Sequence, residues 1–107
     1  MIRSFVAVLA FAAANAAAAA DTEYTIVIKN HLFVPASIEV PADTKLVLIV
    51  DNQDATPEEF ESHSLKREKI IAGGTSARIK LGPLKAGEYN FFGEFNEKTA
   101  QGKLIVK

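Results

Sequence analysis

The 107-residue sequence has no cysteine and no tryptophan, and its only methionine is Met1. The absence of cysteine excludes disulfide bonds, thiolate zinc sites and thiol nucleophiles. It also excludes a blue copper centre, because that centre needs a cysteine ligand. Charge of either sign is not in excess: 12 Lys and Arg residues face 13 Asp and Glu residues. A nucleic-acid binder has an excess of basic residues on its surface, and this composition has none, so we expect no nucleic-acid partner.

The first twenty residues are typical of an export signal. Arg3 supplies a positive start, residues 5–14 are apolar, and three alanines, residues 18–20, precede Asp21. This order predicts a signal peptide over residues 1–20 that is removed from the mature protein. An uncleaved anchor or an alanine-rich helix is the alternative interpretation. We therefore expect a periplasmic mature domain, residues 21–107, that is not embedded in the membrane once the signal is cleaved.

After Asp21 the apolar residues alternate with polar ones or form short β-branched runs, which indicates strands rather than helices. Glycine and proline mark the turns between them. The pattern is typical of one small all-β sandwich or barrel. In the last aromatic stretch, Tyr89, Phe91, Gly93 and Phe95 alternate, so we expect them to share a face in the core. The predicted strands are residues 23–29, 33–40, 45–50, 60–65, 68–72, 76–81, 88–95 and 103–106.

An acidic segment, residues 51–65, follows the third predicted strand. Because side chains alternate along a strand, Glu59, Glu61 and His63 would lie on one face and Glu58 on the other. Carboxylate and imidazole ligands suit divalent iron, copper, manganese or zinc, whereas monovalent copper would need sulfur. A solvated acidic surface is the alternative. His63 and His31 are too few for a closed zinc site.

A second polar segment, residues 89–102, carries Glu94, Asn96, Glu97 and Gln101 between two predicted strands. Loops between strands often hold binding residues, so this segment is a second candidate for a functional site. A polar connection without function is the alternative.

Several stretches in order resemble the cupredoxin family. They are NHLFVPASIEVPA (residues 30–42), NQDATPEEF (residues 52–60) and GPL with GEY (residues 82–84 and 87–89). More narrowly, the chain resembles the periplasmic cupredoxin-like proteins that accompany bacterial iron permeases. The motifs that carry this resemblance are TPEEFESH (residues 56–63), GPLKAGEY (82–89), FFGEF (91–95) and TAQG (99–102).

The resemblance implies a small Greek-key β-sandwich and a metal-binding end. The family's copper ligands, an early His and a later Cys, His and Met, fall on Glu58, Gly93, Asn96 and Gln101. In the iron-associated group the position of Asn96 is often His, so the resemblance implies weaker binding here, the use of His63 instead, or no metal binding at all. The candidate metal ligands are Glu58, Glu59, Glu61, His63, Glu94, Asn96 and Gln101.

The resemblance also implies a function. It predicts a periplasmic accessory protein of iron acquisition that binds divalent iron or copper and assists iron oxidation or delivery. The expected partner is an iron permease or another periplasmic component of iron uptake. On its own the protein would be at most a redox accessory protein rather than an enzyme. The alternative is a metal-free β-sandwich that docks on a periplasmic or membrane partner through its glutamate-rich end.

Overall fold

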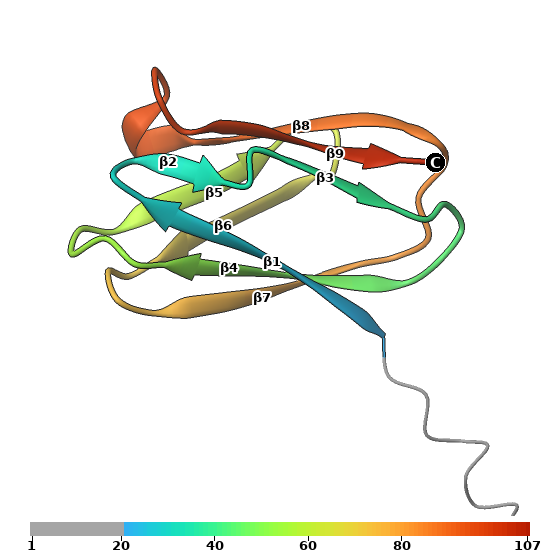
Figure 1. The fold of residues 1–107 in the computed structure, drawn as a ribbon, viewed down its shortest axis with the longest axis horizontal. Coiled ribbons are helices and arrows are strands. Elements are labelled where there is room, and N and C mark those ends of the chain that lie inside the picture. Colours follow the sequence, from blue (N-terminus) through green and yellow to red (C-terminus); the bar gives the residue numbers. More distant parts are fainter. Residues whose placement is uncertain (1–20) are drawn as a thin grey trace, which may run out of the picture.

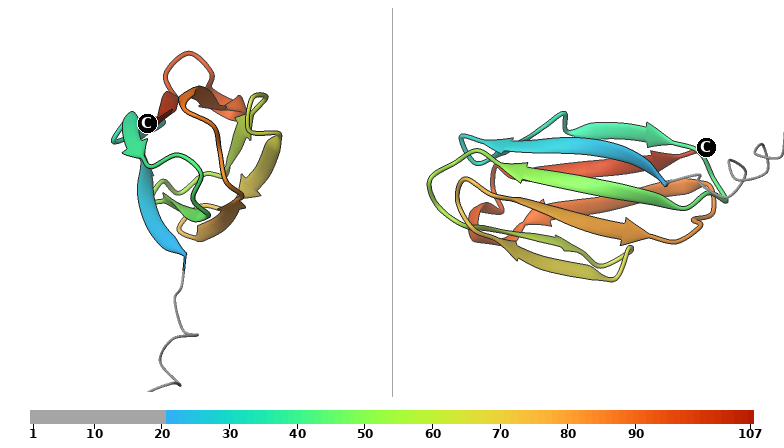
Figure 2. Two further views of the ribbon diagram at one scale, coloured as in Figure 1. Left: turned by 90° about the vertical axis from the view of Figure 1, so that its right-hand side faces the viewer. Right: turned by 90° about the horizontal axis from the view of Figure 1, so that it is seen from below.

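The computed structural model describes residues 21–107, so the predicted signal peptide lies outside the described part of the chain. Two β-sheets pack face to face in this part (Figures 1 and 2). The strands are β1 (Thr22–Lys29), β2 (Leu32–Val34), β3 (Ser37–Val40), β4 (Leu46–Asn52), β5 (Glu58–Ser62), β6 (Arg67–Ile71), β7 (Ser76–Leu81), β8 (Gly87–Gly93) and β9 (Gln101–Val106), with the short 3-10 helix η2 (Glu94–Asn96) between β8 and β9.

The strand order confirms the predicted all-β sandwich. One sheet has the order β2-β1-β4-β7 and the other the order β3-β9-β8-β5-β6. Strands β1 and β4 pair in parallel, as do β3 and β9, and the other pairs are antiparallel. Neighbours in a sheet are therefore often distant in the sequence, which brings β5 beside β8 and places η2 next to β5.

Three phenylalanines from both sheets form the centre of the core. The rings of Phe60 and Phe91 stack with centroids 5.1 Å apart, and Phe33 meets Phe91 edge-on at 5.0 Å. Each such pair adds about 1 kcal/mol to the stabilisation from burial alone. Strand β7 shows the alternation that produces this core, because Ala77, Ile79 and Leu81 are buried while the residues between them are exposed.

The prediction of one strand over residues 33–40 was wrong. The segment forms two strands, with Pro35 and Ala36 between them. Strand β2 pairs with β1 in one sheet, and β3 pairs with β9 in the other. Proline has no N–H to donate to a ladder, so pairing is interrupted where the chain crosses from sheet to sheet.

The prediction that Phe95 lies in the core was also wrong. Phe91 and Gly93 are buried and Tyr89 packs against the core, as the alternation predicted. Strand β8 ends at Gly93, however, and Phe95 lies in η2 with 49% of its surface exposed. Alternation stops where the strand stops, and no residue pattern marks that boundary.

The carboxylate of Asp54 holds the loop after β4 against the turn between β1 and β2. It accepts hydrogen bonds from the backbone amides of His31, at 2.9 Å, and Asn30, at 2.7 Å. These bonds hold the pKa of Asp54 below its ordinary value. His31 lies in a left-handed turn, and its carbonyl accepts a hydrogen bond from Thr99 at 2.6 Å. Asp54 and Thr99 thus fix three loops at the end of the sandwich that carries η2.

Within residues 21–107, no helix has the length and apolar character needed to cross a membrane.

Candidate metal centre

Strand β5 presents its glutamates to opposite sides of the sheet, as the sequence predicted. Glu58, Phe60 and Ser62 are buried, with at most 2% of each exposed, and face the interior. Glu59 and Glu61 alternate with them and therefore lie on the outer face. The predicted ligands on β5 consequently belong to two separate places, one inside the sandwich and one outside.

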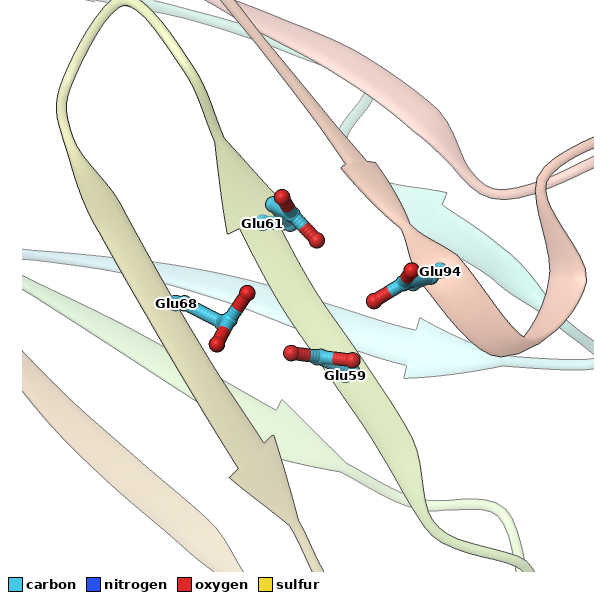
Figure 3. Close-up of side chains that lie close together, drawn as sticks. All are labelled: Glu59, Glu61, Glu68 and Glu94. Atoms are coloured by element: carbon cyan, nitrogen blue, oxygen red, sulfur yellow. The ribbon is translucent and has the colours of Figure 1, made fainter.

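Four glutamates meet on the outer face, and we call them the acidic cluster. Glu59 and Glu61 come from β5, Glu68 from β6 and Glu94 from η2, and their carboxylates point toward one another (Figure 3). One carboxylate oxygen from each residue lies within 4.8 Å of the others. The sheet brings them together because Glu61 is directly opposite Glu68 in the β5–β6 pair.

The acidic cluster lacks a lysine or arginine partner within residues 21–107; its one ion-pair contact is between Glu61 and the His63 ring, at 3.7 Å. A hydrogen bond to Glu94, together with desolvation and the neighbouring negative charges, raises the pKa of Glu59 to about 7. Desolvation, followed by Glu94, also raises the pKa of Glu61. The second oxygen of Glu61, Oε1, is buried without a hydrogen-bond partner. The cluster therefore carries more negative charge than its surroundings compensate, and a proton or a cation would relieve it.

The donor set favours a hard divalent cation. All four groups offer carboxylate oxygens, which suit manganese, ferrous iron, calcium and magnesium better than monovalent copper. Oxygens on opposite sides of a calcium ion lie roughly 4.8 Å apart, and those around a first-row ion lie slightly closer. The spacing of the cluster thus needs only small side-chain movements to hold such an ion.

The inner glutamate, Glu58, has its hydrogen bonds satisfied by the protein itself. Its Oε1 accepts from the backbone amides of Glu59 and Phe95, both at 2.9 Å. Its Oε2 accepts from Nδ2 of Asn96 at 2.8 Å. The structure therefore brings two predicted ligands, Glu58 and Asn96, into contact with each other rather than into the acidic cluster.

Two further predicted ligands are not among the four glutamates of the acidic cluster. His63 borders the cluster at its rim: Nδ1 lies 3.7 Å from a carboxylate oxygen of Glu61, the side chain is 80% exposed, and the ring lies against Phe92 at a centroid distance of 5.5 Å. Gln101 instead donates from Nε2 to the carbonyl of Glu97 at 2.9 Å.

The sequence analysis missed Glu68, which lies in the charged stretch at residues 66–69. The register of a β-hairpin could have predicted its position. A turn over residues 63–66 places residue 61 opposite residue 68, as the structure has it. The sequence does not show where this turn lies, because no glycine or Asn-Gly pair marks it.

The fold and the comparisons define the class of protein. Two sheets with this strand order form a cupredoxin-like sandwich. The chain belongs to the cupredoxin-like domain family, whose model matches residues 2–106. It is 55% identical over 84 residues to the uncharacterized protein RP394 of Rickettsia prowazekii, covering 78% of this chain and 67% of that one.

Solved structures share the fold at low sequence identity. Auracyanin A, a blue copper protein of Chloroflexus aurantiacus, superposes with a TM-score of 0.70 at 14% identity, over 82% of this chain and all of that one. A chain in the structure of a heme-copper terminal oxidase dimer superposes with a TM-score of 0.67 at 18% identity. That match covers 81% of this chain and 65% of the oxidase chain, so this chain spans less than two thirds of it.

The copper that the cupredoxin fold implies does not fit this chain. No cysteine is present, so there is no blue copper site. A Cβ atom built on Gly93, the position of the family's cysteine, would lie 2.6 Å from the carboxylate of Glu58 and 2.8 Å from Cβ of Ala100. The buried side chain of Glu58 therefore fills the space that a ligand at position 93 would need.

Proposed function

We propose that this cupredoxin-like protein is a periplasmic accessory protein of iron acquisition that binds a divalent cation at the acidic cluster. Ferrous iron is the cargo, and an iron permease or another periplasmic component of iron uptake is the partner. The motifs at residues 56–63, 82–89, 91–95 and 99–102 support this role through their resemblance to iron-permease-associated proteins.

One observation carries the metal-binding part of the proposal. Four carboxylate oxygens lie within 4.8 Å of one another on the outer face of the five-stranded sheet. Such a concentration of negative charge, without a lysine or arginine paired to it in residues 21–107, is stabilised by a hard cation.

Delivery is the role that this donor set supports best. Four carboxylates provide hard oxygen ligands that suit a divalent cation such as ferrous iron. The exposed positions of Glu68 and Glu94 leave the cluster open to solvent and to a docking partner. A cargo site needs both properties.

A titration with Mn²⁺, anaerobic Fe²⁺, Cu²⁺ and Zn²⁺ tests the binding claim. We expect one ion per chain, with Mn²⁺ and Fe²⁺ bound, and a loss of affinity of at least about tenfold in the variant Glu94→Gln, because one charged ligand is lost. Isothermal titration calorimetry at pH 7.5 measures this.

The matched control is Glu97→Gln, which removes an exposed carboxylate just after η2 and outside the acidic cluster. It should bind as the wild type does. Equal affinities in the two variants, or no stoichiometric binding by the wild type, would refute the metal site.

The alternative, a metal-free interaction module, is favoured by a different observation. Glu58 closes the family's copper position, and Leu32, Val34 and Phe95 are each at least 45% exposed. Exposed apolar side chains of this size suit docking. In that case the wild type should bind no divalent cation stoichiometrically, and Phe95→Ser or Glu94→Gln should weaken capture of a partner.

A further inference from the structure

We propose that Glu58 is the positioning residue of the acidic cluster. Its buried carboxylate fixes the two backbone segments that carry Glu59 and Glu94, and so sets the distance between these two cluster members. This inference rests on the proposed cation site, and it assigns to Glu58 a role that does not include binding the ion.

The pairing of β5 with β8 explains why a positioning residue is needed. The paired residues are Glu61 with Phe92 and Phe60 with Gly93. Continued by one step, the same register would place Glu59 opposite Glu94. The strand ends at Gly93, however, and Glu94 begins η2. The backbone ladder therefore stops one residue before the two glutamates that must face each other.

Glu58 supplies the missing contacts beyond the end of the ladder. A single oxygen, Oε1, accepts hydrogen bonds from the amide of Glu59 on β5 and from the amide of Phe95 in η2, both at 2.9 Å. Oε1 thus binds the backbone of Glu59, which belongs to the cluster, and the backbone of Phe95, which follows Glu94. Asn96, the last residue of η2, donates to the other oxygen at 2.8 Å.

The position of Glu58 leaves it little freedom to move. It is 1% exposed, and its carboxylate lies where a side chain at Gly93 would be. Hydrogen bonds to an ionised carboxylate are shorter and stronger than those between neutral groups. Three hydrogen bonds to this buried side chain hold η2 against β5 and so hold Glu94 beside Glu59.

Exchanging donor and acceptor between Glu58 and Asn96 tests this role. Asn96→Asp places a carboxylate against Oε2 of Glu58, and the repulsion displaces η2. We expect the Kd for Mn²⁺ to rise by about tenfold or more. In the double variant Glu58→Gln/Asn96→Asp, the glutamine amide donates to the aspartate, and the Kd should return to within about threefold of the wild type. The double-mutant cycle isolates this pair from other effects.

A stability-matched control separates positioning from general destabilisation. Ile79→Ala removes buried side chain from β7 in the opposite sheet and should lower the melting temperature without changing the Kd for Mn²⁺. If Asn96→Asp does not fold, Asn96→Ala replaces it, with an expected rise in Kd of about three- to tenfold.

The outcomes distinguish this inference from the proposed function. A wild-type chain that does not bind Mn²⁺ overturns both. A wild-type chain that binds, together with folded Asn96 variants of unchanged Kd or a double variant that does not recover, overturns the role of Glu58 and leaves the cation site in place.

Discussion

Glu58 and Glu59 are adjacent in the sequence and both are buried, yet their side chains point to opposite sides of the sheet and have different neighbours. Glu58 faces the interior and accepts three N–H hydrogen bonds. Glu59 faces outward, where the nearest charged groups are other carboxylates. Alternation along β5 is the sole cause of this difference. One carboxylate therefore stabilises the fold, and the other is available to a proton or a cation.

The outer carboxylates give the metal-free protein a characteristic dependence on pH. The pKa of Glu59 rises from its ordinary 4.5 to about 7 on folding. The folded state therefore binds a proton that the unfolded chain has already lost, so this contribution to stability is complete below about pH 4.5 and is lost as the pH rises through about 7. We expect the melting temperature, measured by calorimetry in the presence of a chelator, to fall between about pH 5 and pH 8.

The variant Glu59→Gln should lose most of this fall, because the group that takes up the proton is gone. Glu97→Gln should retain it. A wild-type melting temperature that stays constant or rises over this interval would contradict the raised pKa of Glu59.

Single residues of the site could be predicted from the sequence to different extents. Alternation correctly predicted that Glu59 and Glu61 share one face of the strand, and the second polar segment, residues 89–102, pointed to Glu94. Glu68 required the register of a hairpin whose turn has no clear signal. The contact between Glu58 and Asn96 could not be read from the sequence, because it depends on where β8 ends and η2 begins.

Among the elements, strands with regular alternation were the easiest to predict. Strand β7 (Ser76–Leu81) has the predicted bounds, and β4 (Leu46–Asn52) starts one residue later and ends two residues later than expected. Two errors lie where a tertiary requirement interrupts the pattern: the crossing between sheets at Pro35 and the change from strand β8 to η2. A third is the strand predicted over residues 60–65, because β5 spans Glu58–Ser62.

The junction of β8 with η2 has no space for the cysteine that a blue copper centre needs. We expect Gly93→Cys to lower the free energy of unfolding by about 1–3 kcal/mol, because the new side chain overlaps Glu58 and Ala100. Added Cu²⁺ should not produce the strong visible absorption of a copper–thiolate bond. Chemical denaturation and absorption spectroscopy measure the two effects.

Ser37→Cys is the control, since it introduces the same thiol at an exposed position of β3. An unchanged stability of Gly93→Cys, or a blue colour with Cu²⁺, would show that the space at position 93 is available to a ligand after all.

The whole molecule has the cupredoxin-like architecture. The glutamates discussed as ligands lie in two separate places on it. The sequence predicted one group of ligands at one end of the domain. In the structure, Glu58 and Asn96 close the interior at that end, and Glu59, Glu61, Glu68 and Glu94 lie on the adjoining outer face. The fold could be predicted because alternation and family motifs agree over nearly all of residues 21–107. The division of the site could not, because it follows from contacts between strands distant in the sequence.

Anomalous diffraction from crystals of the protein soaked in Mn²⁺ tests whether the outer face of the five-stranded sheet binds a divalent cation through four glutamates. We expect one strong manganese peak among Glu59, Glu61, Glu68 and Glu94, at roughly 2.0–2.4 Å from a carboxylate oxygen of each. Absence of a peak there, or a peak bound only by other residues, would contradict it.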